Sequence, residues 1–261
     1  MKAYTKDFYE TRHRKTVYSA NAILSIVLKR IRAIDSAVDV GCGVGTWLSV
    51  LNGMGVSEIL GIDGDWVDQS MLVIPRSCFM QADLAKSVVR LPRRYDLAVS
   101  MEVAEHLPDS CAKEIVAALT QLSDRVLFSA AIPHQGGLNH VNEQWQDYWA
   151  RLFARVGYEV QDFIRPMIWD DEQIPYWYRQ NTLFFSRGKP SVPDLGGTAG
   201  LPGCLNLVHP QLYLDKVRAQ AGVRNNLRML RRSLGDYVSR RLGIGDKTSP
   251  AGHPSLSGKP E

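Results

Sequence analysis

The segment VDVGCGVGTW, residues 38–47, constrains the fold more than any other part of this 261-residue chain. Its glycines, Gly41, Gly43 and Gly45, lie between a short apolar run and a stretch with helical spacing. Glycine lets the backbone turn sharply and approach a ligand closely. A strand, a glycine turn and a helix in this order are typical of open α/β sheets, which bind ligands beyond the carboxyl ends of their strands.

Other short apolar runs, each ending in small or polar residues, recur at 58–63, 95–100 and 125–132. Segments with helical spacing, at 16–33, 111–122 and 144–157, lie between or beside them, and 158–164 and 181–187 have the pattern of strands. Alternating strands and helices predict an α/β fold, with a mostly parallel sheet covered by helices on both faces.

The glycine segment does not fit the common nucleotide fingerprints. A dinucleotide site would have its third glycine at position 46, where the chain has Thr46. A Walker loop requires Gly-Lys-Ser/Thr, which does not follow. The pattern therefore indicates a nucleotide-like ligand without a pyrophosphate.

Two acidic residues stand at predicted strand ends. Asp63 closes the run 58–63, and Asp83 follows the expected third strand, with spacings from Gly45 that fit one strand-helix unit per step. A carboxylate at the end of the second strand can accept both hydroxyl protons of a ribose. Each aspartate is also a plausible helix cap, and the nearby Trp66 is explained equally well as a half-buried surface aromatic.

These segments, together with YDLAVSMEVAEHLPD (95–109), resemble the class I S-adenosylmethionine-dependent methyltransferases, in the branch whose fourth strand leads into Glu-Val-x-Glu-His-Leu. The resemblance covers about residues 16–186. It implies a Rossmann-like sheet of seven strands, with an antiparallel last strand at 181–187, and the cofactor S-adenosylmethionine. The implied cofactor contacts are Asp39 at the loop or the cofactor amine, Gly41, Gly43 and Gly45 at the amino acid part and ribose, Asp63 at the ribose, Gly64, Asp65 and Trp66 beside the adenine, Asp83 and Leu84 at the adenine amine and face, and Met101 and Glu102 beside the methionyl part.

Methyl transfer is an in-line displacement that often needs a base on the acceptor side. His106 and His140 follow the fourth and fifth predicted strands on one edge of the sheet, so either is the expected base, with Glu143 as a partner. A loop-capping role for His106 is the alternative. His134, His140 and Glu143 are also candidate magnesium ligands, but their spacing is irregular and magnesium prefers carboxylates, so no metal is assigned.

Aromatic residues between 145 and 178 are expected to border the acceptor, with Trp145 and Trp149 facing inward on their helix. Segments 139–160 and 174–181 also resemble bacterial methyltransferases of glycan and surface-polysaccharide assembly. The expected reaction is O-methylation of a sugar hydroxyl on a glycan or a nucleotide- or lipid-linked sugar. The alternatives are methylation of a small aromatic, quinone or amine metabolite, and a non-catalytic cofactor-binding scaffold in glycan assembly.

Composition divides the chain into two parts. Residues 1–186 have a net charge of −3 and residues 187–261 one of +7, so the basicity belongs to the tail. The predicted parts are a methyltransferase domain at 1–187, a Gly/Pro linker at 188–204, a basic helical tail at 205–245 and a disordered end at 246–261. The tail has an apolar stripe suited to docking on its own domain, to pairing with another subunit, or to a peripheral membrane contact; its residues are Leu227, Leu230, Leu234, Tyr237, Val238 and Leu242.

Other features of the sequence exclude several classes. Hydrophobic residues make up 45% of the chain, which excludes disorder throughout. No nucleic-acid-binding motif accompanies the basic tail, so no nucleic-acid partner is expected. The four cysteines are widely spaced, the N-terminus is polar, and no stretch approaches the roughly 20 apolar residues of a membrane span. These features predict reduced thiols and a cytoplasmic protein.

Overall fold

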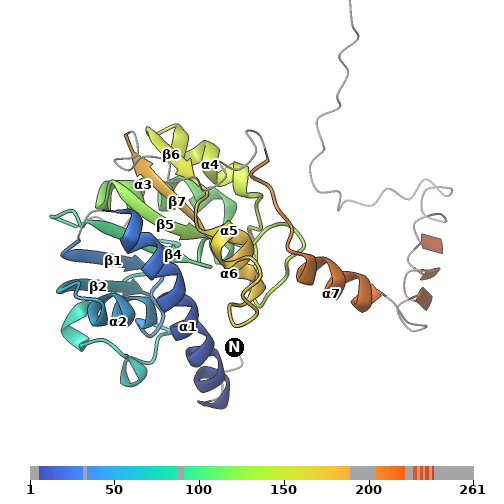
Figure 1. The fold of residues 1–261 in the computed structure, drawn as a ribbon. Coiled ribbons are helices and arrows are strands. Elements are labelled where there is room, and N and C mark those ends of the chain that lie inside the picture. The colour runs from blue at the N-terminus through green and yellow to red at the C-terminus, as the bar shows by residue number, and fades with distance from the viewer. Residues whose placement is uncertain are drawn as a thin grey trace, which may run out of the picture. The chain divides into compact units, whose positions relative to one another are not determined.

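The computed structural model describes residues 6–31, 34–86, 91–188 and 204–220, and a few helical residues of the tail between 226 and 237. These residues form a seven-stranded sheet in the order β3-β2-β1-β4-β5-β7-β6 (Figure 1). The strands are β1 (Ser36–Val40), β2 (Glu58–Asp63), β3 (Phe79–Gln81), β4 (Leu97–Met101), β5 (Arg125–Ser129), β6 (Tyr158–Gln161) and β7 (Leu183–Arg187). Only β7 runs antiparallel to its neighbours, β5 and β6. The predicted Rossmann-like sheet with its antiparallel last strand is confirmed.

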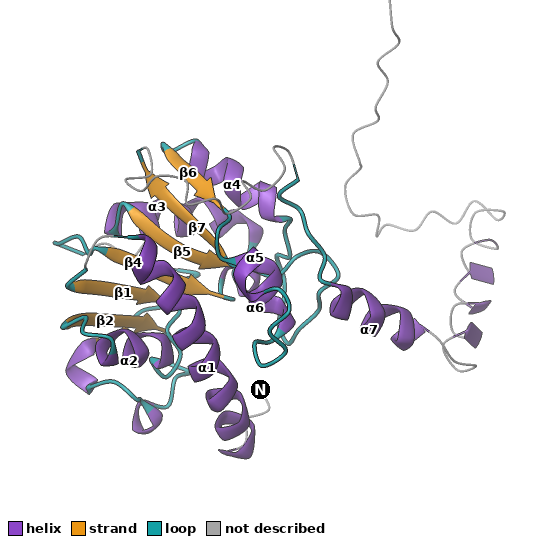
Figure 2. Ribbon diagram, in the orientation of Figure 1, coloured by secondary structure: helices purple, strands orange, loops and turns teal. Residues whose placement is uncertain are grey.

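Helices cover both faces of this sheet (Figure 2). They are α1 (Lys6–Arg30), α2 (Thr46–Gly53), α3 (Ala112–Leu122), α4 (Gln146–Ala154), α5 (Arg165–Ile168), α6 (Tyr176–Asn181) and α7 (Pro210–Gln220), with short 3-10 turns η1 (Gln69–Met71), η2 (Arg76–Cys78), η3 (Ala104–His106) and η4 (Asp109–Cys111). Side chains of α3 and α4 pack on one face of the sheet, and those of α1, α2, α5 and α6 pack on the other. β1 and β4 are buried along their whole length, as expected for the centre of a parallel sheet.

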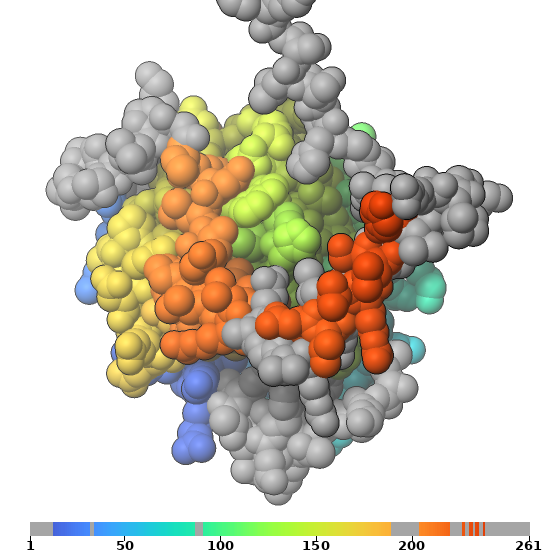
Figure 3. Space-filling model, turned by 90° about the vertical axis from the view of Figure 1, so that its right-hand side faces the viewer, coloured from blue at the N-terminus to red at the C-terminus, as the bar shows by residue number. Residues whose placement is uncertain are grey.

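Residues 204–212 pack against the sheet domain, beyond its predicted end near residue 187 (Figure 3, orange). The buried Arg165 guanidinium donates to the carbonyl oxygen of Leu205 at 3.0 Å, and Gln146 Nε2 donates to that of Leu207 at 2.9 Å. The first compact unit accordingly extends to Leu212. Residues 189–203 of the predicted linker and the predicted disordered end at 246–261 lie outside the described residues.

The second unit begins at Tyr213. Among its described tail residues, Leu227, Leu230, Leu234 and Tyr237 are helical, and each is at least 51% exposed. The rest of the predicted apolar stripe, Val238 and Leu242, lies outside the part that the structure describes. The partners expected for this tail therefore stay predictions.

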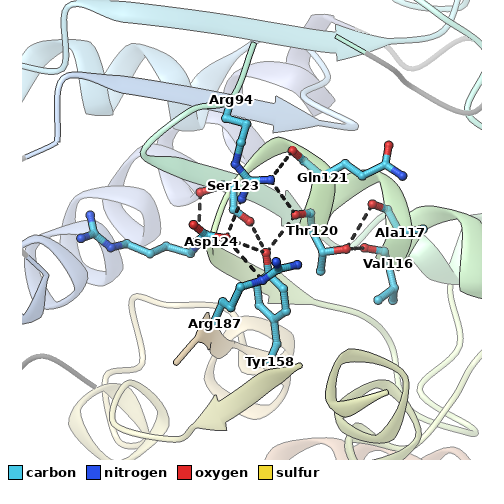
Figure 4. Close-up of polar contacts among 10 residues, drawn as sticks. Arg94, Val116, Ala117, Thr120, Gln121, Ser123, Asp124, Tyr158 and Arg187 are labelled. Carbon is cyan, nitrogen blue, oxygen red and sulfur yellow. Dashed lines mark hydrogen bonds and ion pairs between the residues drawn. The ribbon is translucent and has the colours of Figure 1, made fainter. Parts of the chain in front are cut away.

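A cluster of polar contacts ties the start of the edge strand β6 to the end of α3 and to the residues before β5 (Figure 4). The buried Tyr158 hydroxyl donates to the carbonyl oxygens of Thr120 at 2.9 Å and Ser123 at 2.6 Å. Arg94 donates to Asp124 at 2.6 Å, but both side chains are about half exposed, so this ion pair adds little stability. The cluster holds β5 and β6 in place at the edge away from the cavity described below.

Two further findings concern the thiols and the helices. Cys42, Cys78, Cys111 and Cys204 form no disulfide. No helix in the described ranges combines the length and the apolar character needed to span a membrane.

Candidate active site

A cavity of about 590 Å³ opens at the carboxyl edge of the central strands, within the usual size range of small-molecule sites. Five stretches of the chain meet there: the start of α1, the glycine loop, the end of β4 with η3, the loop after β5, and the start of α6. The lining includes His13, Lys15, Gly41, Gly43, Thr46, Trp47, Met101, Glu102, Glu105, His106, Gln135, Gly137, His140, Tyr176, Trp177 and Tyr178.

The glycine loop needs its glycines for two different reasons. Gly41 and Gly45 both have φ near +86°, and a Cβ atom on them would lie 2.3 Å from Val103 and 2.7 Å from Ile74, respectively. Gly43 has φ +54° and no heavy atom within 4 Å of the position of a Cβ. Gly41 and Gly45 thus let the loop pack closely, while Gly43 keeps a face open to a ligand. Gly45 does not line the cavity; it immediately precedes α2.

Two buried carboxyl groups lie behind this loop. Asp39, opposite Gly61 in the sheet, is 1% exposed, and neither of its carboxyl oxygens has a hydrogen-bond partner. Burial, followed by the charge of Asp63, raises its pKa well above the usual range. Asp63 accepts the backbone N–H groups of Gly43 and Gly64, both at 2.7 Å, although burial still raises its pKa. A cationic ligand would relieve the cost of burying both carboxylates.

The residues expected around the adenine are ordered but do not line the cavity. Trp66 is 59% exposed; its ring lies on Gly64, where a Cβ atom would be 2.3 Å away, and it donates to Asp63. Asp83 accepts the N–H of Ala85 at 3.0 Å and pairs with Lys86 at 2.8 Å, so its carboxylate caps a turn and its pKa is lowered, mainly by Lys86. Leu84 packs on the hydrophobic core. The adenine contacts stay predictions.

Met101 and Glu102 line the cavity where β4 ends, and their contact with the methionyl part of the cofactor stays a prediction. The Glu102 carboxyl accepts hydrogen bonds from Asn181 and Gln135, each at 3.1 Å, while burial raises its pKa. Gln135 in turn accepts from Gln180 at 3.0 Å, and Gln180 accepts the N–H of His209 at 2.8 Å. This network of amides was not predicted, because its members come from distant segments and have no motif.

Glu105 is a further residue that the sequence analysis did not single out, although it lies within the Glu-Val-x-Glu-His segment. Its side chain is fully buried, and neither carboxyl oxygen makes a hydrogen bond of good geometry. Burial, followed by the charge of Glu102, raises its pKa well above the usual range. Its carbonyl oxygen accepts the N–H groups of Val141 and Asn142, which places the 135–143 loop beside η3.

The structure brings together the three predicted acceptor-side residues. The rings of His106 and His140 meet edge to face, with centroids 4.9 Å apart. Glu143 Oε1 lies 2.9 Å from Nδ1 of His140 and also accepts the N–H of Gly136 at 2.6 Å. His106 Nδ1 is 3.4 Å from the carbonyl oxygen of Asn139, consistent in part with the loop-capping alternative. His134 is exposed and does not line the cavity, so the candidate magnesium ligands His134, His140 and Glu143 do not come together there.

The aromatic cluster is divided between the core and the cavity. Tyr176, Trp177 and Tyr178 line the cavity, whereas Trp149 is 2% exposed within the core. The prediction that Trp145 faces inward is wrong: it is 38% exposed, because it precedes the first residue of α4 and does not follow the helical register.

The start of α1 adds a wall that was not predicted. His13 and Lys15 line the cavity, and His13 Nδ1 lies 3.2 Å from the hydroxyl of Thr46 at the start of α2. The helix expected at 16–33 begins ten residues earlier in the structure, at Lys6. The polar residues on this extension show no apolar periodicity, so the sequence pattern did not predict that the helix includes them.

The fold and the cavity define a class of protein: an α/β domain with a ligand-binding cavity at the glycine loop. The chain matches the family model described as a methyltransferase domain over residues 11–164, and it belongs to that family. S-adenosylmethionine is the cofactor of this family. The site fits it, because the open face of Gly43 lines the cavity and the unpartnered carboxyl of Asp39 is buried behind the same loop, which suits a ligand that carries cationic and nucleoside parts.

Solved structures share the fold at low sequence identity. An O-methyltransferase family protein from Burkholderia thailandensis superposes with a TM-score of 0.51 at 11% identity, covering 70% of this chain and 58% of that one. Magnesium protoporphyrin IX methyltransferase from Synechocystis PCC 6803 with bound SAH gives 0.47 at 21% identity, covering 68% and 84%. The present chain thus spans little more than half of the Burkholderia protein. No curated protein sequence matches it.

Proposed function

We propose that this S-adenosylmethionine-dependent methyltransferase methylates an oxygen atom, with a sugar hydroxyl on a glycan or on a nucleotide- or lipid-linked sugar as the acceptor. One observation carries the proposal. A single cavity has the open Gly43 at one end, with the carboxyls of Asp39 and Asp63 buried behind its loop, and at the other end two imidazoles, one of which has a carboxylate partner. This arrangement suits a cationic methyl donor facing an acceptor that must lose a proton.

The residues at the cofactor end hold and orient the cofactor. When bound, S-adenosylmethionine supplies an electrophilic methyl group. The unpaired carboxyl of Asp39, buried behind the loop, would favour a cationic group at this end, and Gly43 allows close approach of the ligand to the backbone. Asp63 uses one lone pair on each oxygen to fix Gly43 and Gly64, which leaves further lone pairs for ribose hydroxyls.

The acceptor end activates an oxygen atom. A neutral hydroxyl is a weak nucleophile, and a positioned imidazole accelerates its deprotonation. Glu143 Oε1 fixes the His140 ring through Nδ1, which leaves Nε2 to act on the acceptor. His106 stands beside it, 4.9 Å away between ring centroids. Their side of the cavity is therefore the acceptor side.

Aromatic and polar groups together support the sugar assignment. Tyr176 and Trp177 offer ring faces to a sugar ring, while Lys15 and His13 offer donors to hydroxyl groups. A small aromatic or quinol acceptor would use the same ring faces but would make less use of these donors. The sugar hydroxyl is preferred on this ground.

The test is release of S-adenosylhomocysteine with a panel of nucleotide sugars and oligosaccharides, compared with catechols, quinols and amines. We expect turnover with a sugar and a loss of about 10²- to 10⁴-fold in kcat for His140→Ala, with unchanged cofactor affinity. His134→Asn is the matched control, because His134 is exposed and Asn tolerates its φ of +67°. Preference for a quinol or amine would reject the sugar, and full turnover by His140→Ala would reject the acceptor-side assignment.

A further inference from the structure

We infer that Glu105, His106 and His140 form a binding site for a divalent transition-metal ion on the acceptor side of the cavity. Each residue offers one ligand atom, and these atoms all lie within 4.8 Å of one another. Ligand atoms bonded at about 2.1 Å to one ion lie roughly 3–4 Å apart. Side-chain rotations that move the ligand atoms by about 1 Å would therefore bring all three within bonding distance of one ion. The inference deepens the proposed function and depends on it only for the role of the ion.

The environment of Glu105 is the first observation that favours a cation. Its side chain is fully buried, its oxygens lack hydrogen bonds of good geometry, and the charge of a second carboxyl, Glu102, acts on it. Among the described residues, no lysine or arginine pairs with either glutamate. Buried carboxylates are retained when they are paired or coordinate a metal, and an ion at this position would meet that need.

The orientation of the imidazoles is an independent observation. Nδ1 of His140 pairs with Glu143 at 2.9 Å, and Nδ1 of His106 faces the carbonyl oxygen of Asn139 at 3.4 Å. Metal-bound histidines usually donate their second ring N–H to a carboxylate or a carbonyl, which fixes the tautomer and aims the other nitrogen at the ion. Gly137 makes room for this, since a Cβ atom there would be 2.1 Å from Nε2 of His140.

The donor set selects the class of metal. Imidazole nitrogen favours zinc and the other first-row transition metals, whereas magnesium and calcium prefer all-oxygen sites. Three protein ligands in an open cavity leave further positions for an exchangeable oxygen. With an ion bound, His140 would serve as a ligand in place of the base role given to it above. The ion would make an acceptor hydroxyl more acidic, and the hydroxyl proton would pass to water.

Metal binding is tested without turnover, on the full-length chain stripped with EDTA. Titration with MnCl₂, followed by the EPR signal of free Mn²⁺ and by calorimetry, should show one ion per chain. We expect Glu105→Gln and His140→Ala to weaken binding at least 10-fold, and Glu143→Gln, which acts through His140, about 10-fold. His134→Asn should bind like the wild type. Absence of saturable binding, or unchanged affinity in Glu105→Gln and His140→Ala, overturns the inference.

Folding and the proposed function are tested separately. In EDTA, Glu105→Gln should unfold at a temperature at least as high as that of the wild type, because a neutral amide replaces an unpaired buried carboxyl. If this variant does not fold, Mn²⁺ binding by His140→Ala and Glu143→Gln tests the metal site instead. Calorimetry with S-adenosylhomocysteine in EDTA provides the other comparison. Cofactor binding without Mn²⁺ binding rejects the metal site alone, while Mn²⁺ binding without cofactor binding supports the metal site and rejects the proposed function.

Discussion

The two ends of the cavity are built in different ways. The cofactor end is formed mainly by one continuous segment, 38–47, whose backbone is shaped by Gly41 and Gly43. The acceptor end is assembled from side chains that are distant in sequence, such as His106, His140 and Tyr176. A site made by backbone geometry imposes residue types at fixed spacing, whereas a site made by tertiary contacts leaves no such pattern.

The largest expected effect concerns Gly41. In Gly41→Ala the new methyl group would meet Val103 at 2.3 Å at a φ of +86°, so overpacking and backbone strain together should cost about 2–5 kcal/mol of stability. Urea unfolding measures this loss. Unfolding identical to the wild type would show that the loop can relax away from Val103.

Gly43→Ala is the matched variant on the same loop. Its Cβ would meet no atom of the protein within 4 Å, so only backbone strain of about 1 kcal/mol is expected. Its methyl group would enter the cavity, and the affinity for S-adenosylhomocysteine should fall at least 10-fold. Equal stability losses in the two variants would contradict the distinction between packing and ligand-facing glycines.

The contrast also explains what could be predicted from the sequence. The glycine turn, the sheet and the approximate position of Asp63 follow from local strand and turn patterns, and Met101 and Glu102 were named by the family resemblance. Glu105 could not be predicted, because burial without a hydrogen-bond partner depends on the tertiary structure and leaves no local pattern. Residues 204–212 follow a Gly- and Pro-rich stretch. Nothing in the local sequence indicates that the carbonyl oxygens of this segment accept hydrogen bonds from the buried side chains of Arg165 and Gln146.

A smaller effect is expected for pH. The folded-state pKa values of Asp39 and Glu105 are raised, so their stabilising contribution is complete below the pKa values of the unfolded chain, near 4, and is lost as pH rises through the raised values. The cofactor- and metal-free protein should therefore lose stability as pH increases above about 4, by up to about 1.4 kcal/mol per pH unit for each group.

Thermal unfolding between pH 5 and pH 8 checks this expectation and separates the two ends of the cavity. S-adenosylhomocysteine should restore stability mainly through Asp39, and Mn²⁺ through Glu105. Asp39→Asn should therefore reduce the slope of Tm against pH in the ligand-free protein. A slope that is flat in the wild type, or unchanged in Asp39→Asn, would show that these carboxyls are relieved by other means.

Binding of S-adenosylhomocysteine by calorimetry, in the wild type and in Asp63→Ala, tests the cofactor site most directly. Asp63 fixes Gly43 through its backbone N–H at 2.7 Å, and loss of hydrogen bonds to a charged group costs about 1.5–3 kcal/mol, which is about 10- to 100-fold in affinity. Asp68→Ala, which removes an exposed carboxyl that caps η1, is the matched control and should bind normally. Saturable binding by the wild type and a loss of at least 10-fold in Asp63→Ala are expected; no binding by the wild type, or equal binding by Asp63→Ala, would contradict the cofactor site.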